Sequence, residues 1–443
     1  MDTSKMPASY KELAKWAMAL SLKQGCQGAQ ISVHTGSDSE FTVRDRQLDK
    51  VQQSASKKMV LKLYADGRYG SFSTNRMDKR DLRTFIERAV ESVRCLAPDP
   101  CRQLPAPEKY DTGRDADLAL YDPNIAKLQP GEKRQLAQDA AGEILGADAR
   151  ILSVQASYCD SEMASFLVAS NGFEGERSAS DFTLYVSVSV KGEGESRPEA
   201  DWYERSLFFD GLIKKNVGKT ALGRALRKLG QKKIGSGKYP MLVDNIGSVR
   251  LLAPLLSALS GSALQQKNSF LLDKKGRQVL SEKLTLIDDP RTPRCFGSRY
   301  FDDEGVATQR RAVFNKGVLE TYFIDTYNAL KMGVEPTVSS PSRLVVEGGR
   351  RSLEEMAAAL DKGVLVTGFN GGNCNGTSGD FSFGIEGFLI ENGKMAKPVS
   401  EMNITGNMLA LWKNLAEVGN DPRQCTAYQI PSLLFQDVDF SGL

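Results

Sequence analysis

The first 230 residues contain the same order of predicted elements twice, and this repetition constrains the fold more than any other feature of the chain. Each copy begins with a helical segment, continues with about four strand-like segments and ends with a second helical segment. The first copy comprises segments at 9–24, 29–35, 40–47, 57–65, 68–74 and 77–96. The second comprises segments at 131–146, 150–158, 162–169, 180–190, 200–209 and 212–230. The copies share no residue-level identity, so the pattern predicts a structural duplication of about 1–100 and 130–232.

Turn and cap signals support these segments. Asp66-Gly67 lies between two strand-like segments and is typical of a two-residue hairpin turn. In the second copy, Asn171-Gly172 is predicted to form the turn that follows the segment at 162–169. Asn75 is predicted to cap the helix at 77–96, because a short polar side chain can accept hydrogen bonds from the first free backbone N–H groups.

The composition shifts at 230–237 (GQKKIGSG), a stretch typical of a linker. Short strands and turns dominate beyond it, around a few helices, which indicates an α+β fold. The predicted elements are a strand at 239–243, helices at 246–260, 325–332, 352–361 and 406–418, and a glycine-rich loop at 368–379. We expect an N-terminal α+β domain at 1–234 with two helix–four-strand–helix repeats. We expect a C-terminal domain of mainly antiparallel strands at 235–443.

The chain has a single histidine, His34, among 443 residues. One copy of the chain therefore cannot form a site that needs two histidines, which excludes His-rich zinc hydrolase motifs and facial-triad iron sites. His34 lies in a strand-like segment, and its predicted role is that of a solvent-facing structural residue. Residue chemistry alone thus identifies no active site.

Charge and cysteine content bear on partners and compartment. Lys and Arg number 58 against 55 Asp and Glu, and this balance argues against nucleic acid as the main partner. The seven cysteines form no C-x-x-C pair and suit reduced thiols. Residues 8–24 are amphipathic rather than signal-like, and the longest apolar stretch, 251–259, is too short for a membrane span. We expect a cytoplasmic protein without a membrane partner.

The densest acidic group lies between positions 288 and 304. It consists of Asp288, Asp289, Asp302, Asp303 and Glu304, and Gly305 follows it. Carboxylates in this number could bind a hard cation. They could equally be turn and cap residues at strand ends, which is the favoured interpretation.

Long segments of the C-terminal half resemble the TldD/PmbA family, whose other name is modulator of DNA gyrase. They read YPMLVDN (239–245), SGSALQQKNSFLLDKKGRQVLSEKLTLIDDP (260–290), FDDEGVATQRRAVFNKGVLETYFIDTYNALKMG (301–333), SGDFSFGIEGFLIENGKMAKPVSEMNITGNM (378–408) and VGNDPRQC (418–425). The resemblance extends over the whole chain in order and length. The chain departs from it at 336–350 (PTVSSPSRLVVEGGR), where relatives often carry a Thr-Gly-containing motif, so a substrate contact in that segment is in doubt.

The resemblance distinguishes two branches of the family. The TldD branch carries H-E-x-x-x-H on the helix after the first C-terminal strand, with a late cysteine as a further zinc ligand. The corresponding segment here, IGSVRLLAPLLSALSG (246–261), has neither His nor Glu, and Pro254 is predicted to interrupt it. Cys425 falls near the late cysteine, but one thiolate cannot hold zinc in a catalytic geometry. The chain therefore resembles the PmbA/TldE branch, which lacks the zinc motif, and no catalytic or metal residue is assigned to it.

The resemblance implies a non-metal subunit of a cytosolic TldD/TldE-type metallopeptidase that degrades unfolded peptides and small proteins. Zinc and catalysis would reside in a TldD-like partner, and this chain alone would form a homodimer. A direct nucleic-acid partner is not implied. One alternative is a stand-alone homodimeric regulatory or peptide-binding protein without catalysis. Another is an enzyme whose 288–304 carboxylates bind a metal.

Overall fold

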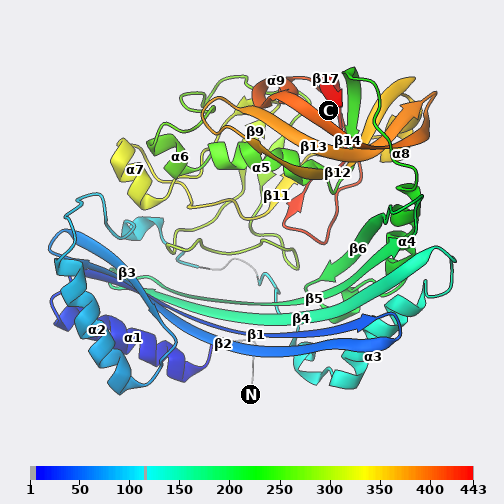
Figure 1. Cartoon of the computed structure of the whole chain (residues 1–443). Helices are drawn as coiled ribbons and strands as arrows, with labels where there is room; N and C mark the ends of the chain where they lie inside the picture. Colours follow the sequence, from blue (N-terminus) through cyan, green and yellow to red (C-terminus); the bar gives the residue numbers. More distant parts are fainter. Residues whose placement is uncertain (1–5, 114–116, 443) are drawn as a thin grey trace.

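The computed structural model describes residues 6–113 and 117–442, and it confirms the α+β class. A long curved sheet with helices on its convex face forms the lower half of the molecule in Figure 1. A second body, built from the C-terminal half, lies over the concave face of that sheet. Among the described residues, no helix has both the length and the apolar character that a membrane crossing requires.

The lower sheet has six antiparallel strands in the order β3-β2-β1-β4-β5-β6. The first strands of the two repeats, β1 and β4, pair at its centre, so both repeats share one continuous sheet. The strands are β1 (Gly28–Arg44), β2 (Gln47–Ala65), β3 (Arg68–Thr74), β4 (Ile151–Ala169), β5 (Glu174–Val190) and β6 (Glu199–Ser206).

Each repeat has three strands, whereas the sequence pattern predicts about four. Two predicted pairs of short strands, 29–35 with 40–47 and 150–158 with 162–169, are the single long strands β1 and β4. The polar middle of β1 resembles a break in the sequence. In the structure, however, Gly36 is opposite Ser56 of β2 and Met163 of β4, and neighbours on both sides keep the backbone extended.

Helices cover the two ends of the convex face. Helices α1 (Ala8–Lys23) and α2 (Lys79–Arg94) pack on one end, and α3 (Pro130–Gly142) and α4 (Val217–Arg227) pack on the other. The predicted cap at Asn75 is wrong, because α2 begins after Asp78, whose carboxylate accepts the N–H groups of Arg80 and Asp81.

The predicted hairpin turn at Asp66-Gly67 is confirmed. Both residues have positive φ, 53° and 70°, as a two-residue turn between twisted strands requires. The turn joins β2 to β3, with Ala65 opposite Arg68.

The C-terminal body contains a ring of strands in the order β14-β13-β12-β7-β17, closed by pairing of β14 with β17. β15 adds to β17, and a smaller sheet has the order β10-β9-β8-β11-β16. The strands of the ring and its extension are β7 (Gly237–Val243), β12 (Lys362–Cys374), β13 (Asp380–Glu391), β14 (Lys394–Asn407), β15 (Leu415–Val418) and β17 (Leu433–Gly442). Those of the smaller sheet are β8 (Leu286–Asp288), β9 (Arg311–Asn315), β10 (Val318–Leu319), β11 (Leu344–Val346) and β16 (Tyr428–Gln429).

Five helices pack around these strands, and two predictions for this half need correction. The five helices are α5 (Ser248–Ala258), α6 (Gly261–Gln265), α7 (Thr326–Met332), α8 (Leu353–Ala358) and α9 (Met408–Lys413). The helix predicted at 406–418 is shorter, because α9 gives way to β15 after Asn414. The glycine-rich run predicted as a loop is a bulged strand up to Cys374, where β13 pairs with β12 across the glycines.

Candidate functional site

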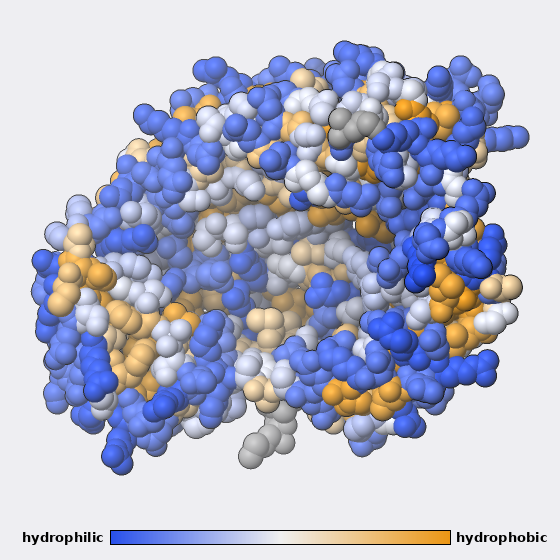
Figure 2. Space-filling view, viewed as in Figure 1, coloured by the Kyte–Doolittle hydropathy of each residue, from blue (hydrophilic) through white to orange (hydrophobic). Residues whose placement is uncertain are grey.

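A cavity of about 800 Å³ lies where the C-terminal body meets the concave face of the six-stranded sheet. Figure 2 shows the hollow between the two halves of the molecule. Most of its described walls come from β5 (residues 176–181), the segment that precedes α3 (117–121 and 123) and the loop 295–301 of the C-terminal body. This volume lies in the range of ligand-binding pockets, and the walls combine arginine and acidic side chains with aromatic ones.

The edge of β5 forms one wall of the cavity. β6 pairs with β5 only over Phe182–Ser189. The segment around Leu120 runs along the preceding residues of β5, and the Ser180 N–H donates to the carbonyl of Leu120 at 3.1 Å. The polar, proline-containing stretch at 97–130 therefore helps to build the cavity, a role that its composition does not indicate.

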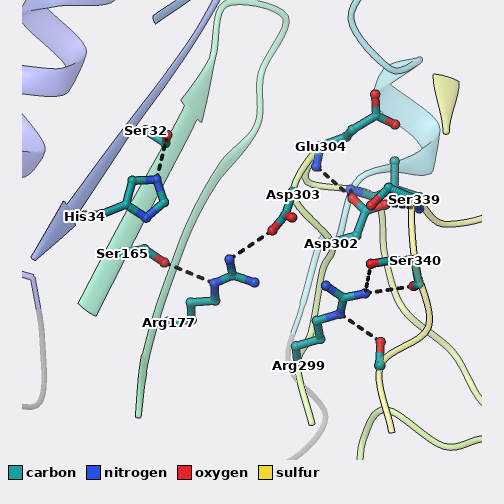
Figure 3. Close-up of polar contacts among 12 residues, drawn as sticks. Ser32, His34, Ser165, Arg177, Arg299, Asp302, Asp303, Glu304, Ser339 and Ser340 are labelled. Carbon is teal, nitrogen blue, oxygen red and sulfur yellow. Dashed lines mark hydrogen bonds and ion pairs between the residues drawn. The ribbon is translucent and has the colours of Figure 1, made fainter. Parts of the chain in front are cut away.

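Arg177 of β5 connects the sheet to the acidic loop of the C-terminal body. Its guanidinium donates to Ser165 of β4 and forms an ion pair with Asp303 at 3.0 Å (Figure 3). His34 lies nearby on β1, half-buried, with Nε2 2.9 Å from the Ser32 hydroxyl. Burial, with Lys58 and Arg177 close by, lowers the pKa of His34 below 6.5. His34 thus lines the sheet as a neutral polar residue that is half-buried rather than fully solvent-facing.

Asp302 organises the acidic loop. Its side chain is 0% exposed, and one oxygen accepts the N–H groups of Glu304 and Val306 at 2.9 and 3.0 Å. The other oxygen accepts the N–H of Ser339 at 2.7 Å (Figure 3). Arg299 adds a second link to the same segment through Ser340. The acidic loop therefore fixes the 336–350 segment, at which the sequence departs from its relatives.

Glu304 and Gly305 complete the loop. The Glu304 carboxylate accepts the N–H and the hydroxyl of Thr326, and its carbonyl accepts the side-chain amide of Gln30 from β1. Gly305 has φ of 91°, and a Cβ there would lie 2.8 Å from the Phe173 ring. Glycine is thus required where the loop crosses an aromatic side chain of the sheet.

Replacing Glu304 by glutamine should change how stability depends on pH. Burial raises the pKa of Glu304 above 4.5, so its contribution to stability is present at low pH and is lost as the pH rises through its folded-state pKa. A glutamine side chain does not ionise, so the variant does not lose this contribution to stability. We expect the Tm of the variant, relative to that of wild type, to rise between pH 4 and pH 7. Calorimetry at both values measures this, and a constant difference would contradict it.

Asp288 and Asp289 bind the other side of the 336–350 segment. Asp288 on β8 is buried and accepts the N–H groups of Ser342 and Arg343. Burial raises its pKa above 3.8. Asp289 forms an ion pair with Arg343 at 2.9 Å. In residues 6–113 and 117–442, no three His, Cys, Asp or Glu side chains are grouped to hold a metal ion. The hydrogen bonds agree with the turn and cap interpretation for Asp288, Asp302 and Glu304, whose carboxylates accept backbone N–H groups. Asp289 and Asp303 instead form ion pairs with arginines.

Cys425 lies at a second candidate site, beside α5. The Cys425 sulfur accepts from Nε and Nη2 of Arg423 at 3.3 and 3.2 Å. The Arg423 guanidinium also stacks over Trp202 at 4.3 Å. Arg224 of α4 reaches the same indole and lies 3.6 Å from Asp244, whose pKa burial raises. Two guanidinium groups, an indole and one thiol therefore meet here.

These residues do not fit a zinc ion. Helix α5 has neither His nor Glu, and the lone thiol is bonded to a cation that would repel a dication. Pro254 does not interrupt α5 as predicted, because the helix buries Leu251, Leu252 and Leu255 on both sides of it.

Sequence reasoning missed Arg177, Arg423 and Trp202. Arg423 had a local signal, since it lies two residues before the late cysteine. Arg177 and Trp202 had none, because their roles depend on contacts with distant loops.

Comparison with known proteins places this geometry in a family. Three family models match the chain. They are PmbA/TldA metallopeptidase domain 1 over residues 29–93, the PmbA/TldA metallopeptidase central domain over 99–229, and the PmbA/TldA metallopeptidase C-terminal domain over 236–442. Metalloprotease PmbA of Escherichia coli O157:H7 is 28% identical over 429 residues, covering 96% of this chain and 94% of that protein.

Two solved structures are similar over nearly the whole chain. One, from Bacteroides thetaiotaomicron, is described as a candidate modulator of DNA gyrase; it is 53% identical, with a TM-score of 0.97, and the match covers 99% of this chain and 100% of that one. TldE from Thermococcus kodakarensis is 20% identical with a TM-score of 0.85, covering 98% and 100%, and shares the fold. From the three consecutive domain matches and the 53% identity, we conclude that the chain belongs to the PmbA/TldD family of metallopeptidase-like proteins.

Proposed function

We propose that the chain is the non-metal, PmbA/TldE-like subunit of a TldD/TldE-type zinc metallopeptidase. The observation that carries the proposal is the site beside α5. There the Arg423 guanidinium is bonded to Cys425, and α5 contributes no His or Glu. Zinc and the attack of its bound water on a peptide carbonyl would belong to a TldD-like partner.

In this proposal the cavity holds part of the substrate. Its walls offer cations, carboxylates and aromatic side chains within one space of about 800 Å³. An extended, unfolded peptide presents backbone groups and alternating side chains of mixed character, which such walls can contact without selecting one sequence. The substrates would therefore be unfolded peptides and small proteins.

The assembly and its location extend the proposal. We treat 1–234 and 235–443 as two domains, with the cavity between them. The isolated chain would form a homodimer, and a TldD-like chain would replace one copy in the active assembly. A cytoplasmic location fits the seven cysteines, all of which are free thiols.

The test is to purify the chain alone, a TldD-like chain from the same cell, and the two together. Zinc content and cleavage of an unstructured fluorogenic peptide are then measured for each. We expect no stoichiometric zinc and no cleavage from this chain alone, and at least about tenfold faster cleavage from the mixture than from the TldD-like chain alone. Zinc-dependent cleavage by this chain alone would overturn the proposal.

A stand-alone peptide-binding protein is the second candidate, and the cavity within this one chain favours it. Peptide binding by the isolated chain, together with failure to associate with any TldD-like chain, would support that candidate instead.

A further inference from the structure

The outer edge of β2 has no neighbouring strand between Gln47 and Lys58 in the described part of the chain. β3 pairs with β2 only from Met59 to Ala65, and every residue from 47 to 58 is exposed. Figure 1 shows β2 at the margin of the sheet, running from the α1–α2 end to the α3 end. A long edge of this kind is a template for another strand.

The second repeat provides an internal comparison. β5 occupies the same place in its repeat as β2, and β6 likewise pairs with only its later part. The chain itself covers the earlier part of β5, through the hydrogen bond from Ser180 to Leu120 and the ion pair of Arg177 with Asp303. Residues 175–181 of β5 are buried or half-buried as a result. The duplicated architecture thus covers one of its two equivalent edges and exposes the other.

The hairpin turn determines which backbone groups of β2 face outward. A two-residue turn makes Ala65 and Arg68 a hydrogen-bonded pair, so the backbone groups of Ala65 point toward β3. Because this direction alternates along a strand, every odd-numbered residue back to Val51 points its N–H and C=O the same way. Beyond the end of β3, the groups of Val51, Gln53, Ala55 and Lys57 therefore point away from the molecule.

This edge is complementary to itself. When a second copy is placed antiparallel across a two-fold axis at Gln53, the two Gln53 residues form a hydrogen-bonded pair. Val51 is then opposite Ala55. At both ends of the contact, Lys57 comes opposite Asp49, which lies at a bulge of β2 and also pairs with Arg44 of its own copy at 3.3 Å. Centring the axis one residue later, on Ser54, would instead place Lys50 opposite Lys58. Charge complementarity thus favours the first register.

The exposed apolar side chains of the edge agree with this arrangement. Leu48 and Val51 are 46% and 50% exposed, and they lie on either side of the bulge of β2 at Asp49. Val51 is opposite the buried Phe41 of β1 on the convex face. An added strand would cover Val51 from its open side and extend that apolar row.

We propose that β2 residues 49–57 pair antiparallel with the same residues of a second copy, centred on Gln53, and join two six-stranded sheets into one. The inference rests on the homodimer of the proposed function and names its surface. The two concave faces would then line one continuous trough.

Charge reversal tests the register by sedimentation equilibrium. Asp49→Lys and Lys57→Asp each create like-charge pairs at both ends of the contact, and each should weaken the dimer about tenfold. The double variant D49K/K57D restores opposite charges and should return the dissociation constant to near the wild-type value. The control is Glu91→Lys, a charge reversal at an exposed position of α2 away from the edge, with circular dichroism to verify folding.

Cross-linking tests the centre of the contact. Gln53→Cys places two thiols opposite each other with Cα atoms about 5.5 Å apart, within reach of a disulfide. We expect a covalent dimer on mild oxidation, above the background of wild type with its seven native cysteines. Ser71→Cys, exposed on β3, serves as the control and should stay at that background.

The outcomes separate this inference from the proposed function. If the dissociation constant of the dimer is unchanged by both charge reversals and the dimer does not cross-link at position 53, only the proposed β2 surface is overturned. A monomer at every concentration would overturn the homodimer as well. Cross-linking at position 53 only to a TldD-like chain would overturn the second copy as the occupant of this edge.

Discussion

Replacing Asp302 by alanine should lower the free energy of unfolding by about 3–5 kcal/mol, because three buried or partly buried backbone N–H groups lose their acceptor. Ser339 would lose its link to the acidic loop, and the 336–350 segment would be held mainly from the Asp288 side. Denaturant unfolding measures the change. Asp302→Asn, which keeps one carbonyl oxygen, should lose less.

The neighbouring residue provides the control. Asp303 forms one ion pair with Arg177, and its side chain is 65% exposed. Asp303→Ala should therefore cost less than about 1 kcal/mol. If these carboxylates bound a metal, Mg²⁺, Ca²⁺ or Zn²⁺ would raise the Tm of wild type and both substitutions would remove that increase. We expect no increase in wild type, and a clear one would contradict the capping role of Asp302.

The order of elements was predictable from the sequence because hydrophobic periodicity and turn residues are local signals. The Asp66-Gly67 hairpin and the repeated helix–strands–helix order depend only on such signals. The lengths of β1 and β4, in contrast, do not depend on local signals alone. Polar residues at 36–39 resemble a break, and only the pairing of β1 with strands on both sides keeps them extended. Strand number is thus decided by contacts that a single sequence does not display.

The candidate sites show the same division. The acidic group between 288 and 304 could be found from composition, and its favoured interpretation as turn and cap residues agrees with the hydrogen bonds. Its partners could not be found, because they come from the 336–350 segment and from β5. The cavity had no sequence signal, since its walls come from several distant parts of the chain.

The duplication links the cavity to the proposed assembly. Each repeat leaves part of one strand edge beyond its third strand, on β2 and on β5. On β5 the segment 117–123 lies along that edge and, with the loop 295–301, forms much of the cavity wall. On β2 the edge remains available for a second subunit. In our proposals, the same architectural element would enclose the substrate in one repeat and mediate assembly in the other.

Replacing Arg423 by methionine should lower the free energy of unfolding by about 2–4 kcal/mol. The side chain of Arg423 is 10% exposed, and its guanidinium donates to the carbonyl of Tyr203 and lies 3.9 Å from Glu204. Methionine fills similar space over Trp202 but supplies no donor, so buried acceptors on β6 lose their partner. The substitution therefore weakens the contact between β6 and the late C-terminal loop, which joins the two halves of the molecule at one end. Hydrogen exchange should accelerate in β6 and in residues 419–427.

Two further variants make this result specific. Gln424→Met is the same kind of change on an exposed neighbour and should alter stability by less than about 0.5 kcal/mol. Arg423→Lys keeps the positive charge but loses the planar group that reaches Tyr203, Cys425 and Trp202 together, so its loss should be intermediate. Neither Arg423 variant should acquire zinc, because removing the cation leaves one thiol and creates no second ligand. An Arg423→Met protein as stable as wild type would show that the guanidinium does not hold this junction. Stoichiometric zinc in that variant would show that Arg423 alone keeps a metal from this site, and the subunit assignment would have to be revised.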